Sequence, residues 1–193
     1  MKRIGIFGGT FDPIHLGHLI IVESASEILN LDEVLFVPTG IPPHKKIDGL
    51  TDRETRFRMV SEAVLSNSKF KASDIEIYKE TECYTIETLR ALQTENNPDN
   101  KYFLLMGMDS GKDFFNWREP YEILKLAKVV AMRRHGYDSE NISTNNLSVI
   151  DTPVIDISAS DIRKRVRENK SIKYKVTNEV EKIIYELNLY KDR

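Results

Sequence analysis

Two histidines near the N-terminus, His15 and His18, stand where a predicted helix begins. A glycine-rich stretch, residues 8–11, precedes them and follows the apolar run 4–7, so the local pattern is strand, glycine turn and helix. Glycines let the backbone approach a phosphate, and the N–H groups and positive dipole end of a helix start attract it. Two imidazoles three residues apart lie on one face of the first helical turn. These residue types in this order indicate a site for the phosphates of a nucleoside triphosphate.

A second segment suited to anions lies near the C-terminus, where Ser158, Ser160 and Arg163 are spaced as Ser-x-Ser-x-x-Arg. Serine hydroxyls and N–H groups at a helix start can bind phosphate, and an arginine on the first turn neutralises its charge. Alone, the pattern is also typical of a plain helix cap, but beside the histidine segment a phosphate role is favoured. A zinc site is not favoured for the histidines, because no third or fourth Cys or His ligand stands at suitable spacing.

The two segments resemble the motifs of a known superfamily. Residues 8–18 are similar to the T/HxGH signature of the nucleotidyltransferases, and residues 157–163 to their ISxTxIR-type motif, with Ser160 where threonine is more usual. Within that superfamily the chain most closely resembles the bacterial nicotinate-nucleotide adenylyltransferases. Further segments in the family's order extend the resemblance over almost the whole chain: residues 42–45, residues 84–89, residues 107–110, Trp117 and residues 133–137.

The resemblance implies roles for residues on the nucleotide side. His15 and His18 would be the catalytic residues, in contact with the α- and β-phosphates of ATP in the transition state. ATP would arrive with Mg²⁺ bridging its phosphates, and no ligand set for a resident metal is predicted. Asp109 stands where family members position the adenylate ribose or the metal. The residues implied in ATP binding are Gly8, Gly9, Thr10, Phe11, Gly107, Asp109, Ser158, Ser160 and Arg163.

On the acceptor side the resemblance implies contacts with nicotinate mononucleotide from Lys45, Thr85, Trp117 and Arg134. Trp117 would stack on the pyridine ring, although a core position is the ordinary expectation for a sole tryptophan. Thr85 would offer its backbone N–H, at a helix start, to the pyridine carboxylate. A helix start favours a negative charge, and donors facing the amide NH₂ of nicotinamide mononucleotide would lack partners. The expected acceptor is therefore the acid rather than the amide.

The implied reaction is transfer of the adenylyl group of ATP to nicotinate mononucleotide, which gives deamido-NAD and pyrophosphate in NAD biosynthesis. The attacking phosphate is already an anion, so the reaction needs alignment and charge stabilisation rather than an enzymic nucleophile or a strong base. The glycine turn, the histidines and the isolated cationic residues match that demand. Two other functions remain open: another adenylyltransferase of the superfamily, such as one acting on phosphopantetheine, and a non-catalytic nucleotide-binding or sensing module.

The elements that must position these residues alternate between short apolar runs and helical patterns. Strands are expected at 3–7, 33–38, 70–77, 102–106, 128–133 and 147–150, and helices at 16–29, 53–65, 86–93, 121–126, 161–168 and 178–187. Such alternation predicts βαβ units with right-handed crossovers. The expected fold class is α/β, a Rossmann-like, doubly wound, mostly parallel sheet with flanking helices and a C-terminal helical segment, in a single domain spanning 1–193. Thr51 and Glu54 are predicted to form a capping box.

Composition limits the class of protein. The chain of 193 residues is 40% hydrophobic and 30% charged, as is ordinary for a globular domain. Its net charge of −2 argues against a broad nucleic-acid or membrane surface. The basic run 163–175 is either a phosphate-facing surface or, as we favour, a solvated helix face.

Cysteine content and hydropathy indicate the cellular compartment of the protein. The sole cysteine, Cys83, is expected to be a small core filler, and such usage suits a reducing compartment. No apolar stretch approaches membrane-spanning length. We therefore expect a cytoplasmic protein without membrane or nucleic-acid partners. The sequence does not determine the oligomeric state, and a homo-oligomer is compatible with it.

Overall fold

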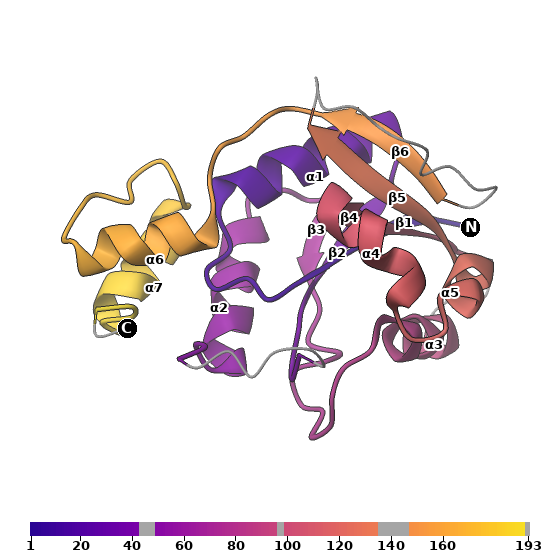
Figure 1. Ribbon diagram of the computed structural model, residues 1–193, viewed down its shortest axis with the longest axis horizontal. Coiled ribbons are helices and arrows are strands. Elements are labelled where there is room, and N and C mark those ends of the chain that lie inside the picture. Colours follow the sequence, from indigo (N-terminus) through magenta and orange to yellow (C-terminus); the bar gives the residue numbers. More distant parts are fainter. Residues whose placement is uncertain (43–48, 96–98, 135–146, 192–193) are drawn as a thin grey trace.

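A six-stranded sheet forms the centre of the computed structural model, which describes residues 1–42, 49–95, 99–134 and 147–191 (Figure 1). All five strand pairs are parallel, and the order is β3-β2-β1-β4-β5-β6. The order turns back between β1 and β4, as in the doubly wound Rossmann sheet. The strands are β1 (Arg3–Gly9), β2 (Glu33–Pro38), β3 (Phe70–Ala72), β4 (Lys101–Gly107), β5 (Ala127–Arg134) and β6 (Leu147–Thr152).

Helices cover both faces of this sheet (Figure 1). One face packs against α1 and α2, beyond which α6 and α7 extend the same hydrophobic core, and the other face packs against α3, α5 and the short 3-10 turn η1. No helix in the described ranges has the length and apolar character that a bilayer crossing requires. The helices are α1 (Leu16–Ile28), α2 (Arg53–Val64), α3 (Thr85–Glu95), α4 (Met108–Asp113), η1 (Phe114–Asn116), α5 (Pro120–Leu126), α6 (Ala159–Arg167) and α7 (Asn178–Glu186).

The central strands are buried on both sides because their side chains alternate between two hydrophobic cores. In β4, Phe103 and Leu105 pack under α1 and α2, whereas the flanking Tyr102, Leu104 and Met106 pack under α3 and α5. Continuous apolar runs of this kind are typical of parallel strands covered by helices. This burial explains why these strands could be predicted from their composition.

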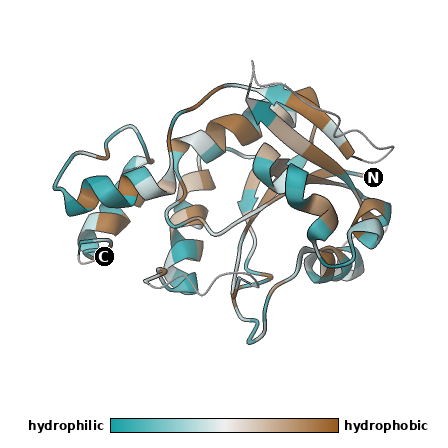
Figure 2. Cartoon of the chain, in the orientation of Figure 1, coloured by the Kyte–Doolittle hydropathy of each residue, from teal (hydrophilic) through white to brown (hydrophobic). Residues whose placement is uncertain are grey.

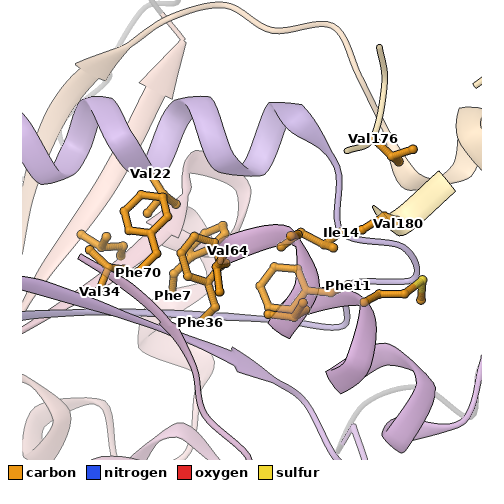
Figure 3. Packing of buried hydrophobic residues seen from close by; sticks show 14 of the residues in the cluster. Phe7, Phe11, Ile14, Val22, Val34, Phe36, Val64, Phe70, Val176 and Val180 are labelled. Atoms are coloured by element: carbon orange, nitrogen blue, oxygen red, sulfur yellow. The ribbon is translucent and has the colours of Figure 1, made fainter. Parts of the chain in front are cut away.

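The C-terminal segment packs against the first turn of the chain. Ile14 belongs to the same core as Val176 and Val180, and Figure 3 shows these side chains together at one end of α1. The N–H of Leu16, the first residue of α1, donates to the carbonyl of Lys175 at 2.9 Å. In Figure 2, α6 is coloured mostly as hydrophilic and the strands mostly as hydrophobic. The basic run 163–175, which begins within α6, is thus mostly a polar outer face, with Val166 and Ile172 as its buried residues.

The predicted fold class is confirmed, two local predictions are wrong, and one helix was missed. The strand expected at 70–77 ends at Ala72, because the chain then turns with the N–H of Ile77 donating to the carbonyl of Asp74 at 2.8 Å. A helix at 108–113 was not expected. The predicted capping box of Thr51 and Glu54 does not form, since Asp52 caps α2 by accepting from an N–H of the first turn at 2.8 Å.

Candidate active site

A cavity of about 350 Å³ lies at the carboxyl ends of β1 and β4, where the strand order turns back. Ligands of open α/β sheets bind at such switch points. The predicted site residues that line this cavity come from the glycine turn, from the end of β4, from the start of α3 and from the turn after η1. They are Gly8, Gly9, Thr10, Thr85, Gly107 and Trp117.

The two predicted catalytic histidines form a stacked pair at the start of α1. His15 is the N-cap residue, and its Nδ1 accepts from the backbone N–H of His18 at 3.3 Å. In return, Nδ1 of His18 accepts from the backbone N–H of His15 at 3.3 Å, and the ring centroids are 3.6 Å apart. Because each Nδ1 accepts, the proton of each neutral ring is assigned to Nε2. The pair therefore presents two Nε2–H donors.

Both imidazoles are neutral at pH 7. Burial lowers the pKa of His15 to about 4. Burial also lowers the pKa of His18 well below its usual range, and the neighbouring His15 lowers it further. Phe11 adds to this apolar setting, since its ring meets the edge of the His18 ring with 5.2 Å between centroids. The site thus offers phosphate oxygens hydrogen bonds from uncharged donors.

Gly17, between the histidines, lies close to the imidazole of His15. A Cβ at this position would lie 3.0 Å from Nδ1 of His15 and 3.4 Å from Cγ2 of Ile155. Gly17 therefore lies between the imidazole of His15 and Ile155 of the segment that leads into α6. This tight contact is a steric reason for a glycine at this position of the HxGH pattern.

The C-terminal anion motif lies against the glycine turn, although 151 positions separate the residues in contact. Nη1 of Arg163 donates to the carbonyl of Asp12 at 2.6 Å. Ser158 caps α6 by accepting from the N–H of Asp161 at 3.1 Å, and its Oγ is 3.1 Å from Oγ of Ser160. Both serines are exposed. The fold thus brings the two motifs together, and Arg163 has a structural bond that the sequence did not predict.

The start of α1 is less open to an anion than the sequence suggested. The N–H of Leu16 is occupied by Lys175, and the N–H of His18 by His15. Other donors near this point are the imidazole Nε2–H groups and the glycine turn, where Phe11 adopts a positive φ of 49°. Two of the first-turn amides that the sequence suggested for an anion are therefore already bonded within the protein.

The acceptor side of the cavity is formed by α3 and by the turn after η1. Thr85 is the first residue of α3, so its N–H has no partner within the helix. Trp117 is half-buried, with its ring 5.8 Å from that of Phe114. Nearby, the guanidinium of Arg118 lies over the ring of Tyr84, 4.6 Å from its centroid. An aromatic wall and a helix start thus share one cavity.

The remaining predicted residues lie at strand and helix ends. Gly107 ends β4 and caps α4 without a side chain, and Asp109 is exposed on the first turn of α4. Arg134 is the final residue of β5, in register with Thr152 of β6. Lys45 lies outside the described residues. A single exposed carboxylate such as Asp109 suits a Mg²⁺ ion that arrives on nucleotide phosphates and keeps most of its waters.

Two buried polar residues at the site were missed from the sequence. Glu76 lines the cavity, where the hydroxyl of Thr88 donates to its Oε1 at 2.6 Å and burial raises the pKa of its carboxyl. Arg56 is buried beneath the glycine turn. A signal for Arg56 was present, because it occupies the helical apolar face defined by Met59, Val60 and Ala63.

Comparison with known proteins agrees with this geometry. A family model described as cytidylyltransferase-like matches residues 6–165. A relative from Shouchella clausii named "Probable nicotinate-nucleotide adenylyltransferase" is 42% identical over 192 residues, which cover 100% of this chain and 98% of the relative. A relative of the same name from Clostridium acetobutylicum is 40% identical over 200 residues, with 98% and 100% covered. The chain belongs to the nicotinate-nucleotide adenylyltransferase family.

Solved structures of other proteins share the fold of this chain. The nicotinic acid mononucleotide adenylyltransferase of Plasmodium falciparum in complex with APC has a TM-score of 0.81, at 22% identity, and covers 100% of this chain and 99% of its own. The same protein in complex with NaAD also gives 0.81, at 23% identity and the same coverage. These structures confirm the Rossmann-like architecture.

Proposed function

We propose that the protein transfers the adenylyl group of ATP to nicotinate mononucleotide and releases pyrophosphate. A phosphate oxygen of the mononucleotide forms a bond to the α-phosphorus of ATP, and the bond from that phosphorus to the α–β bridging oxygen breaks. The product is deamido-NAD, the dinucleotide with a free pyridine carboxylate. The observation that carries this proposal is the stacked pair His15 and His18, whose two Nε2–H donors stand beside a glycine turn that lines the switch-point cavity.

The histidines are suited to electrostatic stabilisation rather than to proton transfer. A general base would need a pKa near the working pH, whereas burial lowers the pKa of His15 to about 4. The attacking phosphate is already ionised, so no proton has to be removed from it. Charge grows instead on the α-phosphoryl oxygens and on the leaving pyrophosphate. We assign the two Nε2–H groups to these oxygens.

Other nucleotide-side groups would bind the triphosphate. We assign the exposed hydroxyls of Ser158 and Ser160 and the start of α6 to its phosphates. Arg163 keeps guanidinium N–H groups besides the one that bonds to Asp12, and it adds positive charge at the same place. Mg²⁺ enters as part of the substrate and neutralises phosphate charge, with Asp109 as the carboxylate placed to contact it or the adenylate ribose.

Different residues of the acceptor site would bind the pyridine ring and its carboxylate. The half-buried ring of Trp117 provides a stacking surface in the cavity. The N–H of Thr85 and the start of α3 favour a negative charge. We further assign Lys45 and Arg134 to the phosphate of the mononucleotide. Since the one cysteine is free and buried, a reducing compartment, the cytoplasm, suits this activity.

A pyrophosphate-release assay with Mg-ATP and a panel of acceptors tests the proposal. Nicotinate mononucleotide should give the highest kcat/KM, with deamido-NAD identified as the product by mass spectrometry. Nicotinamide mononucleotide and phosphopantetheine are the comparison acceptors. Release that is fastest with phosphopantetheine would contradict the assignment of the acceptor. Binding of ATP without release for any acceptor would instead identify a nucleotide-binding module.

A further inference from the structure

Arg56 is a fully buried cation whose hydrogen bonds go to the turn after β1 and to two points of the connection between β2 and α2. Its side chain extends from α2, and the residue is only 1% exposed. Nη1 donates to the carbonyl of Thr10 at 2.7 Å, Nη2 to that of Gly40 at 3.2 Å, and Nε to that of Thr51 at 2.9 Å. These partners are backbone carbonyls rather than carboxylates. One planar group therefore fixes three pieces of backbone relative to one another.

The turn after β1 and the loop after β2 lie on opposite sides of the proposed site. Thr10 belongs to the glycine turn after β1, which leads to the histidine pair. Gly40 belongs to the loop after β2, whose next cavity-lining residue is Pro42. Gly40 lies so close to the backbone of Glu76 that a Cβ there would be 2.1 Å from its carbonyl oxygen, so no side chain fits at this position. The N–H of Cys83, shortly before α3, donates to the carbonyl of Ile41 in the loop of Gly40 at 3.0 Å. The guanidinium thus connects the glycine turn to the acceptor side of the cavity.

A second buried pair supports the arginine. The hydroxyl of Tyr190 donates to Oδ1 of Asp12 at 2.8 Å, and the N–H of Thr51 donates to Oδ2 at 3.5 Å. Asp12 and Tyr190 are 6% and 2% exposed. Burial lowers the pKa of Arg56, and the charge of Asp12 opposes that shift. The carboxylate thus favours the charged guanidinium and at the same time binds a residue from the far end of the chain.

We propose that Arg56, supported by Asp12 and Tyr190, is a positioning residue that sets the distance and angle between the two bound phosphates. The inference rests on the proposed adenylyl transfer. Phosphoryl transfer depends on in-line alignment, and a displacement of about 1 Å can lower the rate about a hundredfold. A guanidinium has donors in fixed directions, whereas a lysine ammonium is a single compact charge that cannot replace three directed bonds. Each loop could still bind its own substrate when the link between them is lost.

The main test compares Arg56→Lys with Arg58→Lys. Arg58 lies on the same helix, is half-exposed and forms a long ion pair with Glu186 at 3.9 Å, so its replacement controls for the loss of an arginine from α2. Three quantities are measured below the melting temperature: kcat with both substrates saturating, and the Kd of Mg-ATP and of nicotinate mononucleotide, each alone. Arg56→Lys should lower kcat by about tenfold or more while each Kd changes by less than about threefold. Arg58→Lys should leave all three unchanged.

Other outcomes would overturn the inference. If kcat of folded Arg56→Lys stays within about threefold of the wild type while its melting temperature falls, Arg56 only stabilises the fold. If both Kd values rise by as much as kcat falls, the loops lose their own structure rather than their alignment. An inactive wild-type enzyme with every acceptor would refute the proposed function itself. Retained wild-type activity with an unchanged kcat in the variant would refute only the positioning role.

Tyr190→Phe keeps the inference testable if Arg56→Lys does not fold. This variant removes only the hydroxyl that binds Asp12. Tyr102→Phe is the matched control, because the hydroxyl of Tyr102 is also buried and donates to the carbonyl of Leu92 at 2.9 Å in the other core. Tyr190→Phe should lower kcat at least about threefold more than Tyr102→Phe at equal loss of melting temperature. Equal kcat values for the two variants would overturn the inference.

Discussion

The two sides of the cavity differ in how the chain builds them. The nucleotide side depends on contacts between distant residues: Asp12 bonds with Arg163 and with Tyr190, which follows it by 178 positions. The acceptor side consists of shorter-range elements, in which Thr85 starts α3 and Trp117 follows η1 directly. A change far away in the sequence can therefore disturb the nucleotide side, whereas the acceptor side depends mainly on α3, η1 and the turn after it.

The largest expected effect is on the nucleotide side. His18→Ala should lower kcat by about two orders of magnitude or more, because removal of one preorganised donor costs about 3–4 kcal/mol in transition-state stabilisation. Steady-state pyrophosphate release measures it, with circular dichroism to confirm folding. Ile20→Ala, at a 40% exposed position of the same helix, is the control. A loss below about tenfold in folded His18→Ala would contradict a direct role in the reaction.

The histidine pair should also make stability depend on pH. The pKa of His15 is about 4 in the folded protein against 6.5 when unfolded, so the unfolded chain binds more protons between these values. The free energy of unfolding should therefore fall as pH drops from 6.5 to 4, by about 3 kcal/mol from this group. Urea titrations across this range measure it. Because His15→Gln cannot titrate, it should show a shallower slope, and parallel curves would contradict the assignment.

The preference for nicotinate mononucleotide over nicotinamide mononucleotide tests the acceptor side of the cavity. Nicotinamide mononucleotide places an NH₂ against the donors at the start of α3, and an unpaired buried donor costs about 1–3 kcal/mol. The lost attraction between charge and helix dipole adds about 0.3–1 kcal/mol. The kcat/KM for nicotinate mononucleotide should therefore be at least about tenfold higher, measured at saturating Mg-ATP. Comparable values would mean that the pocket does not recognise the carboxylate, and that both pyridine mononucleotides are substrates.

The smallest expected effect concerns ring stacking. Trp117→Ala should raise KM for nicotinate mononucleotide by about tenfold and KM for ATP much less, because stacking of an aromatic ring contributes about 1–3 kcal/mol to both ground and transition states. Tyr121→Ala, an exposed aromatic of the neighbouring helix α5, is the control. Equal changes for both substrates would indicate that Trp117 is only part of the core. Together with His18→Ala, this result would separate the two sides experimentally.

The contrast between local elements and contacts of distant residues also explains what could be predicted from the sequence. The strands and most helices follow from local apolar patterns, and the two motifs could be recognised because each occupies a continuous segment. Their contact through Arg163 and Asp12 could not be derived from spacing, since it depends on how α6 packs. The helix α4 was missed because it has six residues and includes Gly111, a weak helix former.

Arg56 shows the limit of pattern analysis most clearly. An arginine on the apolar face of an amphipathic helix is a visible anomaly, yet its meaning depends on three carbonyls from loops that no periodicity identifies. Glu76 is similar, because its partner Thr88 is on another element.

The bonds from Lys175 to Leu16 and from Tyr190 to Asp12 have a consequence for synthesis of the protein on the ribosome. All six strands lie before residue 153, so the sheet can assemble while the later residues are still inside the exit tunnel. The start of α1 and the glycine turn obtain these two partners only after residues 175 and 190 have emerged. A nascent chain would then complete its acceptor pocket first and its nucleotide site last, so adenylyl transfer requires that residues 175–190 have left the exit tunnel.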